Sequence, residues 1–320
     1  MNTKNVLIVG GSGFVGRHLA ARLSARNVSV RVPTRRRERA RHLLPLPTVE
    51  VIEANLADDA TLDALLEGQD AVVNLVGILH GNWGEPYGSD FARAHVALPR
   101  RLALACGRAG VRRFLHMSAL GVPGQPGAGA PSMYLRSKAD GEAAVRESDA
   151  IDWTIFRPSV IFGREDGLLN MFAAIQRVLP VMPLARSRTR FQPVYVGDVA
   201  QAFVNALDNP ATFGRTYELA GPDVYTLAEL ARLAGRLCGH PRPVWHLPDF
   251  LGQMQAALLE MMPGEKLMSR DNFDSLARDN VASGPIAPEL GIDAARLEAI
   301  APSYISPLAP FTSERARAHR

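Results

Sequence analysis

The stretch that decides the fold is Asn5-Val6-Leu7-Ile8-Val9-Gly10-Gly11-Ser12-Gly13-Phe14-Val15-Gly16. A short apolar run followed by glycines at positions 10, 13 and 16 predicts a buried parallel strand, a tight turn and the first turn of a helix. Gly10 lets the chain turn sharply, Gly13 lets the backbone approach a pyrophosphate, and Gly16 lets the helix pack closely. The first amides of the helix would then face phosphates, so the stretch predicts a dinucleotide-binding site.

A second motif lies far along the chain, in Tyr134-Leu135-Arg136-Ser137-Lys138. Residues four apart share one face of a helix, so the phenol of Tyr134 and the ammonium of Lys138 are predicted to point into the same space. The cation favours the phenolate and can also hydrogen-bond a ribose, which leaves Tyr134 as an acid or base for a carbonyl or alcohol. In a chain that begins with a dinucleotide-binding turn, this spacing predicts a catalytic site rather than an exposed helix face.

Together the two motifs resemble the extended, epimerase/dehydratase-like branch of the short-chain dehydrogenase/reductase superfamily. The resemblance continues in Phe114-Leu115-His116-Met117-Ser118, Arg157-Pro158-Ser159 and Pro193-Val194-Tyr195-Val196-Gly197-Asp198-Val199. Three strings are similar to the atypical subgroup that contains the NAD(P)H-binding accessory subunit of respiratory complex I and its bacterial relatives. They are Tyr134-Leu135-Arg136-Ser137-Lys138-Ala139-Asp140-Gly141-Glu142, Ile161-Phe162-Gly163-Arg164-Glu165-Asp166 and Gln192-Pro193-Val194-Tyr195-Val196. The resemblance implies an α/β fold: a doubly wound parallel sheet of the Rossmann type with a smaller C-terminal substrate domain.

The resemblance also implies which residues form the site. Tyr134, Lys138 and Ser118 are expected to be catalytic. The residues expected to contact the cofactor are Gly10, Gly11, Ser12, Gly13, Phe14, Val15, Gly16, Thr34, Arg35, Arg36, Asn55, Leu56, Val76, Gly77, Ile78, Met117, Tyr134, Lys138, Pro158, Ser159 and Ile161. Members of this branch commonly end the fifth strand with two small hydroxyl residues, whereas this chain has Ser118-Ala119. The helix position where many members carry asparagine, within Ala94-His95-Val96, is also altered, so the catalytic set is expected to be incomplete.

Basic residues concentrate between positions 35 and 41. The net charge is +4 and the sequence pI is about 9.3, but one concentrated run does not predict nucleic-acid binding. The run follows an expected strand, Ser29-Val30-Arg31-Val32, and lies where dinucleotide folds meet the adenosine ribose. An acidic residue there would bind a free 2′-hydroxyl, whereas Thr34, Arg35 and Arg36 favour a 2′-phosphate. We therefore expect NADP(H) to be preferred over NAD(H).

The composition indicates a globular protein that folds without disulfide bonds. The chain has 320 residues, of which 47% are hydrophobic, enough for one large or two smaller domains. Cys106 and Cys238 are far apart, and no cysteine or histidine spacing predicts a metal site. Little chain precedes the first strand, so no secretory signal is expected, and no apolar run reaches the ~18 residues that span a bilayer. The expected location is cytoplasmic, with a peripheral position on the inner membrane as the alternative.

Strand and helix patterns alternate along the first half of the chain. They predict an NAD(P)-binding domain from residues 1–160 and about 190–222, a smaller substrate or partner domain from about 161–189 and 223–311, and a flexible basic tail at 312–320. A helix is predicted from Leu168 to Leu179. Between Phe250 and Met262, apolar residues recur at helical spacing; this face is predicted to be core, with a lipid, quinone-tail or partner contact as the alternative.

Three functions remain open at this point. The first is an oxidoreductase that acts on a carbonyl or alcohol. The second is a non-catalytic NADPH-binding scaffold, assembly factor or redox sensor, with a respiratory complex or a membrane surface as partner. The third is a sugar-nucleotide epimerase or dehydratase, in which Arg186, Arg188 and Arg190 would meet the substrate diphosphate.

Overall fold

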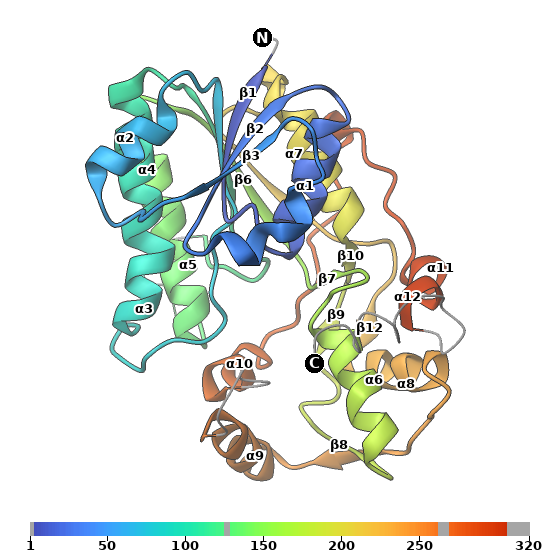
Figure 1. Ribbon diagram of the computed structural model, residues 1–320. Coiled ribbons are helices and arrows are strands. Elements are labelled where there is room, and N and C mark those ends of the chain that lie inside the picture. The colour runs from blue at the N-terminus through green and yellow to red at the C-terminus, as the bar shows by residue number, and fades with distance from the viewer. Residues whose placement is uncertain (1–2, 125–128, 262–268, 306–320) are drawn as a thin grey trace. The chain divides into compact units, whose positions relative to one another are not determined.

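The computed structural model describes residues 3–124, 129–261 and 269–305 (Figure 1). The chain divides into two compact units, and each is built from separate stretches of sequence. The first unit contains residues 1–158, 197–219 and 283–293, and the second contains residues 159–196, 220–282 and 294–320. The sequence prediction placed 190–196 in the nucleotide-binding domain. The structure groups these residues with the second unit, where β10 (Val194–Tyr195) pairs in parallel with β7 (Ile161–Phe162).

The first unit is built on a seven-stranded sheet in the order β11-β6-β5-β4-β1-β2-β3, with every neighbouring pair parallel. Its strands are β1 (Asn5–Val9), β2 (Ser29–Thr34), β3 (Val49–Glu53), β4 (Ala71–Asn74), β5 (Arg113–Met117), β6 (Asp152–Pro158) and β11 (Arg215–Leu219). Central strands of a parallel sheet are covered on both faces, which explains why β1 and β4 are almost continuous apolar runs. The predicted doubly wound parallel sheet is therefore confirmed.

Helices cover both faces of this sheet (Figure 1). The helices of the first unit are α1 (Phe14–Ser24), α2 (Asp59–Leu66), α3 (Ser89–Phe91), α4 (Leu98–Ala109), α5 (Met133–Arg146) and α7 (Val196–Leu207). It also has three 3-10 turns, η1 (Arg37–Leu43), η3 (Pro210–Thr212) and η4 (Pro288–Leu290), and a π-helical turn, η2 (Ala92–Ala97). Leucines of α2 and α4 pack on apolar residues of β1 and β4, which forms one side of the core.

The second unit packs short strands against helices around its own apolar core. Its strands, besides β7 and β10, are β8 (Met182–Ala185), β9 (Arg190–Phe191), β12 (Tyr225–Thr226) and β13 (Val244–Leu247). Its helices are α6 (Leu168–Val178), α8 (Leu227–Leu237), α9 (Asp249–Met261), α10 (Arg270–Ser275), α11 (Leu297–Ile300) and α12 (Pro302–Ile305). The predicted helix from Leu168 to Leu179 is α6. Thr226 begins α8 with a capping box, in which its hydroxyl accepts from the Glu229 amide.

Some sequence predictions fall outside the described residues. These are the tail at 312–320 and Met262, the last residue of the predicted apolar face. Among the helices that the structure describes, none combines the length and the apolar character that crossing a bilayer requires.

Candidate functional site

The turn after β1 has the geometry that its glycines predict. Gly10 has a φ of +86°, a left-handed conformation that favours glycine. A Cβ on Gly16 would lie 2.5 Å from the Gly11 Cα, so α1 starts in backbone contact with the turn. A Cβ on Gly13 would approach only the Gly10 carbonyl oxygen, at 3.2 Å, and Gly13 begins α1 without a side-chain cap. The exposed Gly13 backbone and the first amides of α1 therefore form a cradle that suits a pyrophosphate.

The other residues of this turn pack against the rest of the first unit. Val15 is buried in the core, and the Phe14 ring packs edge-on against the His18 ring, with centroids 5.9 Å apart. A Cβ on Gly11 would lie 2.8 Å from the Val32 side chain, so β2 presses directly on the turn. Gly13 is the exposed residue of the turn, whereas Gly10, Ser12 and Phe14 are half-buried.

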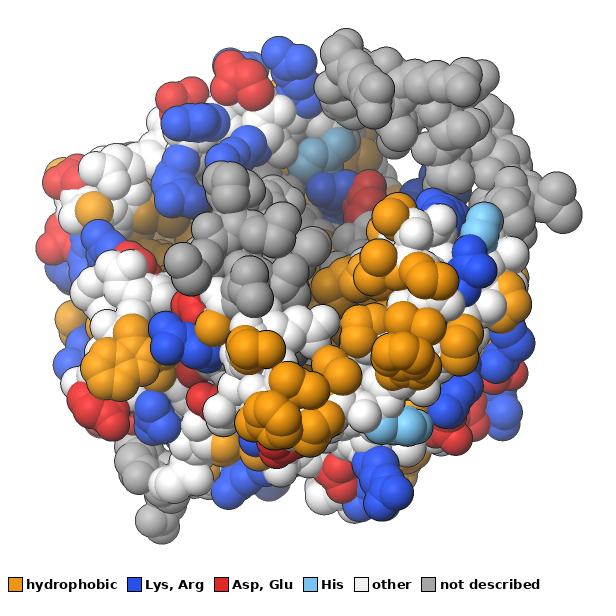
Figure 2. Space-filling model, turned by 90° about the horizontal axis from the view of Figure 1, so that it is seen from below, with side chains coloured by type: hydrophobic (Ala, Val, Ile, Leu, Met, Phe, Trp, Pro, Cys, Tyr) orange, Lys and Arg blue, Asp and Glu red, His pale blue; other side chains and the backbone are white. Residues whose placement is uncertain are grey.

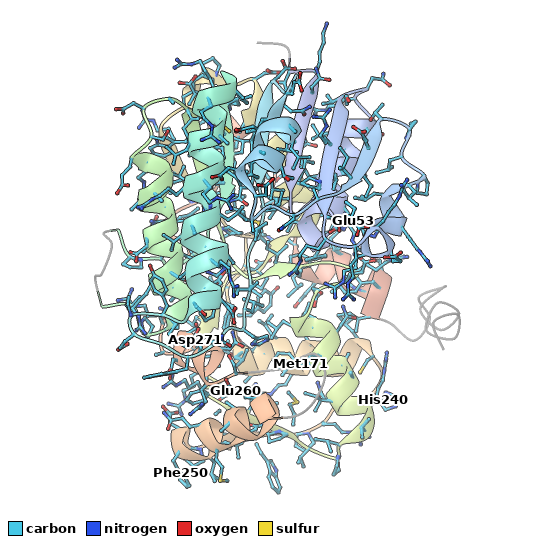
Figure 3. All side chains as sticks on the ribbon, turned by 60° about the vertical axis from the view of Figure 1, so that its left-hand side comes forward. Glu53, Met171, His240, Phe250, Glu260 and Asp271 are labelled. Atoms are coloured by element: carbon cyan, nitrogen blue, oxygen red, sulfur yellow. The ribbon has the colours of Figure 1, made fainter. Side chains whose placement is uncertain are left out.

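The end of β2 carries the predicted ribose-side residues. Thr34 is buried, and its hydroxyl donates to the Arg36 carbonyl oxygen at 3.1 Å, so it shapes the backbone of the basic run. Arg35 and Arg36 are exposed. One residue that the sequence analysis missed is Glu53, which pairs with Thr34 across the β2–β3 ladder and is exposed at the end of β3 (Figure 3). A carboxylate therefore stands at the end of β3, opposite the residue that precedes Arg35.

Asn55 and Leu56 follow β3, where they were expected to border the adenine. The Asn55 carboxamide oxygen accepts from the Ala57 amide at 3.1 Å and so closes a local turn. The Leu56 carbonyl oxygen accepts from the Arg101 guanidinium at 2.7 Å. This loop is therefore fixed by its own side chain and by α4.

The loop Val76–Ile78 lies between the glycine turn and the predicted catalytic lysine and approaches both. A Cβ on Gly10 would lie 3.1 Å from the Val76 nitrogen, and a Cβ on Gly77 would lie 3.3 Å from Lys138 Nζ. The buried Asn74 side chain accepts from the Val76 amide at 3.1 Å and holds the start of the loop. The structure thus brings together three groups of predicted residues: the phosphate turn, this loop and the α5 lysine.

Lys138 is a deeply buried charge at this edge of the sheet. Its side chain is 2% exposed, and Nζ donates to the Met117 carbonyl oxygen at 3.1 Å and to that of Val76 at 3.5 Å. Burial lowers the pKa of Lys138 to about 8, although attraction to Glu142 opposes the shift. Tyr134 lies one turn earlier on α5 and is half-buried. The predicted pair therefore shares one helix and one face.

Ser118 and Ala119 directly follow β5. Ala119 and Tyr134 pack against the same small apolar cluster, so Ala119 brings a methyl group next to Tyr134. Ser118 is 3% exposed, its amide donates to the Phe156 carbonyl oxygen, and its hydroxyl finds no hydrogen-bond partner among the described residues. A buried, unpartnered hydroxyl is the one candidate at this strand end for polarising a substrate oxygen.

Buried polar residues that the sequence analysis gave no role also gather here. Asn74 and His116 are register partners on β4 and β5, and the Asn74 amide donates to His116 Nδ1 at 3.2 Å. Burial lowers the pKa of His116 well below its ordinary value. The sequence does contain a signal for these two residues: each is a polar residue near the end of an otherwise apolar strand. In sheets of this kind, ligands bind at the carboxyl ends of the strands.

The remaining predicted residues divide between the units. Pro158 ends β6 in the first unit, whereas Ser159 and Ile161 belong to the second. There the Ser159 hydroxyl donates to the Asn280 side chain at 2.6 Å, and Ile161 lies in β7. The basic segment of the second unit is largely engaged within it: Arg186 donates to the Phe273 carbonyl oxygen at 2.7 Å and Arg190 pairs with Asp279, which leaves Arg188 exposed.

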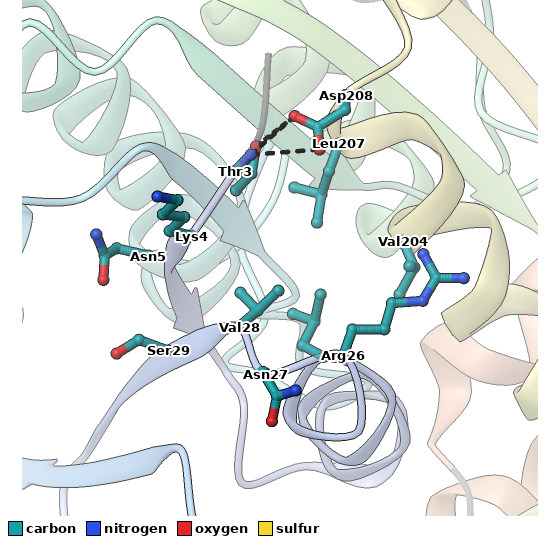
Figure 4. A pocket seen from close by; sticks show the side chains of 11 residues that line it. Thr3, Lys4, Asn5, Arg26, Asn27, Val28, Ser29, Val204, Leu207 and Asp208 are labelled. Atoms are coloured by element: carbon teal, nitrogen blue, oxygen red, sulfur yellow. Dashed lines mark hydrogen bonds between the residues drawn. The ribbon is translucent and has the colours of Figure 1, made fainter.

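A hollow of about 520 Å³ lies at the opposite end of the sheet, where β1 begins (Figure 4). Thr3, Lys4, Arg26 and Asp208 are among its lining residues. The Asp208 carboxylate already accepts from the Thr3 amide at 3.1 Å and from the Thr3 hydroxyl at 2.7 Å. These bonds tie the start of β1 to the end of α7, so the hollow is a structural junction.

The apolar face predicted between Phe250 and Met262 is only partly core. On α9, Gly252 and Ala256 are buried, whereas Phe250 and Met254 are 67% and 56% exposed. Figure 2 shows hydrophobic side chains gathered on the face seen there. The exposed large apolar residues contributed by α6, β13 and α9, here called the apolar patch, are Val178, Leu179, Trp245, Phe250 and Met254.

Comparison with known proteins agrees with this geometry. Residues 6–220 match the model of the NAD dependent epimerase/dehydratase family. The chain belongs to this family. Among solved structures, DesIV, the dTDP-glucose 4,6-dehydratase from Streptomyces venezuelae with NAD and TYD bound, has a TM-score of 0.72 at 20% identity and covers 94% of this chain and 95% of its own.

Curated relatives of this family member include subunits of an NADH dehydrogenase and a reductase. Subunit 9 of the NADH dehydrogenase (ubiquinone) 1 alpha subcomplex, mitochondrial, from Arabidopsis thaliana is 33% identical over 86% of this chain and 70% of the relative. The Rattus norvegicus protein of the same name is 31% identical over 91% and 77%. The ceramide reductase of Caulobacter vibrioides is 30% identical over 76% and 74%. The resemblance to extended short-chain dehydrogenases and to the complex I subunit is thus confirmed.

Proposed function

We propose that the protein binds NADP(H) along the edge formed by the glycine turn, the end of β2 and the loop Val76–Ile78, and that it reduces a carbonyl or oxidises an alcohol there. The observation that carries the proposal is the position of Lys138. Its ammonium donates to the carbonyl oxygens of both Val76 and Met117, and Val76 borders the glycine turn at Gly10. Tyr134 lies on the same helix face, within reach of the same space.

The residues present suit such a cofactor. The amides after Gly13 would hold the pyrophosphate, Arg35 and Arg36 a 2′-phosphate, and Asn55 and Leu56 the adenine. When bound, the nicotinamide supplies the hydride acceptor or donor. In the reducing direction, the Tyr134 hydroxyl would donate its proton to the substrate oxygen, and the Lys138 cation would stabilise the phenolate that remains. The Ser118 hydroxyl would donate to the same oxygen.

A scaffold function is the second candidate, because Ala119 removes a hydroxyl that a reductase of this family would use. The relatives named as NADH dehydrogenase subunits support a respiratory-complex partner. The apolar patch supports a protein contact, since large exposed apolar side chains mark interaction surfaces. A sugar-nucleotide substrate, which neighbours such as DesIV suggest, has weaker support, because Arg186 and Arg190 already bind carbonyl or carboxylate groups.

One pair of measurements tests the reductase proposal. The purified protein should retain NADP(H), detected by mass spectrometry, and that nucleotide should turn over with members of a carbonyl panel. Tyr134→Phe keeps the ring but removes the proton, so NADPH should still bind while turnover falls by about 10²–10⁴.

Complementation in the source cell separates the two functions. If the required function is catalytic, Tyr134→Phe fails to complement despite normal folding and NADPH binding. Full complementation by this variant, with no turnover in vitro, would instead favour the scaffold.

A further inference from the structure

His95 joins the cofactor loop to the helix of the catalytic pair. It lies in the π-helical turn η2 and is 1% exposed. Its Nε2 accepts a hydrogen bond from the Ile78 amide at 3.0 Å, and its Nδ1 lies 2.8 Å from the Ser137 hydroxyl oxygen. Because an amide can only donate, Nε2 carries no hydrogen, and Nδ1–H donates to Ser137. The Ser137 hydroxyl donates in turn to the Tyr134 carbonyl oxygen at 2.8 Å.

The ring is held in this orientation from several sides. A Cβ on Gly141 would lie 2.0 Å from the His95 carbonyl oxygen, so α5 and η2 meet backbone to backbone. The Tyr134 ring packs edge-on against the imidazole, with centroids 5.5 Å apart. Burial, and then the charge of Lys138, lowers the pKa of His95 to about 2. The imidazole is therefore neutral and keeps one tautomer across the physiological range of pH.

The π-helical turn itself points to a functional constraint. Such turns are rare, and they are frequently found at functional sites. Here the π-helical turn carries the His95 side chain, which bonds both to the loop 76–78 and to α5. The loop borders the phosphate turn through Gly10 and Lys138 through Gly77. Its shape therefore affects the part of a bound dinucleotide that lies beyond the pyrophosphate.

We propose that His95 is a positioning residue that fixes the loop Val76–Ile78 in the shape that receives the nicotinamide half of NADP(H), and that it couples this loop to α5. The inference rests on the proposed NADP(H)-binding function. The bond from the Ile78 amide to Nε2 holds the loop and sets the ring tautomer, whereas the bond from Nδ1–H to Ser137 ties the ring to α5.

Two substitutions separate these bonds. A glutamine carboxamide reaches the position of Nε2, so His95→Gln can still accept from Ile78. An asparagine carboxamide reaches only the position of Nδ1, so His95→Asn keeps the contact with Ser137 and leaves the Ile78 amide unpaired. The probes are NADPH and adenosine 2′,5′-bisphosphate, which lacks the nicotinamide half, each titrated by calorimetry into the full-length protein.

We expect His95→Asn to weaken NADPH binding about tenfold or more, and His95→Gln to stay within about threefold of the wild type. The bisphosphate should bind all three proteins alike. Equal NADPH affinity of the two variants, or an equal loss for both probes, would overturn the positioning role. A wild-type protein that binds the bisphosphate but not NADPH would do the same, whereas one that binds neither would overturn the proposed function itself.

A measurement on the wild-type protein keeps the inference testable if a variant does not fold. Nitrogen NMR of the ¹⁵N-labelled histidine ring should show a hydrogen on Nδ1 and none on Nε2, unchanged from about pH 5 to about pH 9. The opposite tautomer, or titration within that range, would contradict the proposal.

Discussion

At the scale of one residue, the buried charge of Lys138 makes the free energy of unfolding depend on pH. Because burial holds its pKa at about 8 against an ordinary 10.5, the unfolded chain binds more protons than the folded chain between these values. The free energy of unfolding should therefore rise with pH across this window. Lys138→Met lacks the dependence, so the stability difference between the two proteins should shift in favour of the wild type from about pH 8 to about pH 10.

Urea denaturation at several pH values measures this difference. The exposed Lys4 provides a matched control, because Lys4→Met should show a constant difference from the wild type. A constant difference for Lys138→Met as well would mean that the lysine is solvated in solution.

Arg35 determines the preference for NADP(H) in our proposal. Arg35→Asp should weaken NADPH binding about ten- to a hundredfold, the effect of losing a hydrogen bond between charged groups, and should leave NADH binding little changed. Arg39→Asp, an exposed change in the same basic run, is the control. Calorimetric titration with NADPH and NADH measures this preference in each protein. Tighter NADH than NADPH binding in the wild type would contradict the proposal and would give Glu53 the ribose role.

The role of a residue could be predicted from the sequence where one short motif indicates it. It could not be predicted where it depends on a contact between residues that are far apart in the sequence. Tyr134 and Lys138 stand four apart on a helix, so the sequence alone places them on one face. The bond between His95 and the Ile78 amide could not be predicted, because it depends on the π-helical turn and on the close approach of α5 at Gly141. The Asn74–His116 pair likewise needs the register of β4 against β5.

At the scale of elements, the glycine turn is the part that the sequence predicts best. Its strand, turn and helix follow one another without interruption, so local rules decide all three. Gly13→Val should abolish NADPH binding while a folded protein remains, because the side chain would fill the phosphate cradle beside the Gly10 carbonyl oxygen. Gly284→Val is the matched control, since a Cβ there meets open space. Calorimetry and circular dichroism together test this, and retained binding would contradict the cradle.

At the scale of the whole molecule, the apolar patch separates the scaffold from the enzyme. Trp245→Ser combined with Phe250→Ser removes two large apolar side chains that are 59% and 67% exposed, so the melting temperature and NADPH binding should change little. If the protein serves a respiratory complex, this variant should no longer migrate with that complex on native gels of solubilised membranes. Trp83→Ser, which removes a 76% exposed tryptophan of the first unit, is the control. Unchanged migration of the double variant would remove the patch from the scaffold argument.

The two units also have a consequence for synthesis on the ribosome. The first unit includes residues 283–293, whose Glu289 and Leu290 carbonyl oxygens accept from the Asn209 and Asn205 side chains in the earlier segment 197–219. A nascent chain that has emerged only to residue 158 lacks β11 and leaves β6 as an unpaired edge. The nucleotide-binding unit can therefore be completed only after most of the second unit has been translated. A chaperone that shields β6 during that interval would serve this protein better than one that acts on the finished chain.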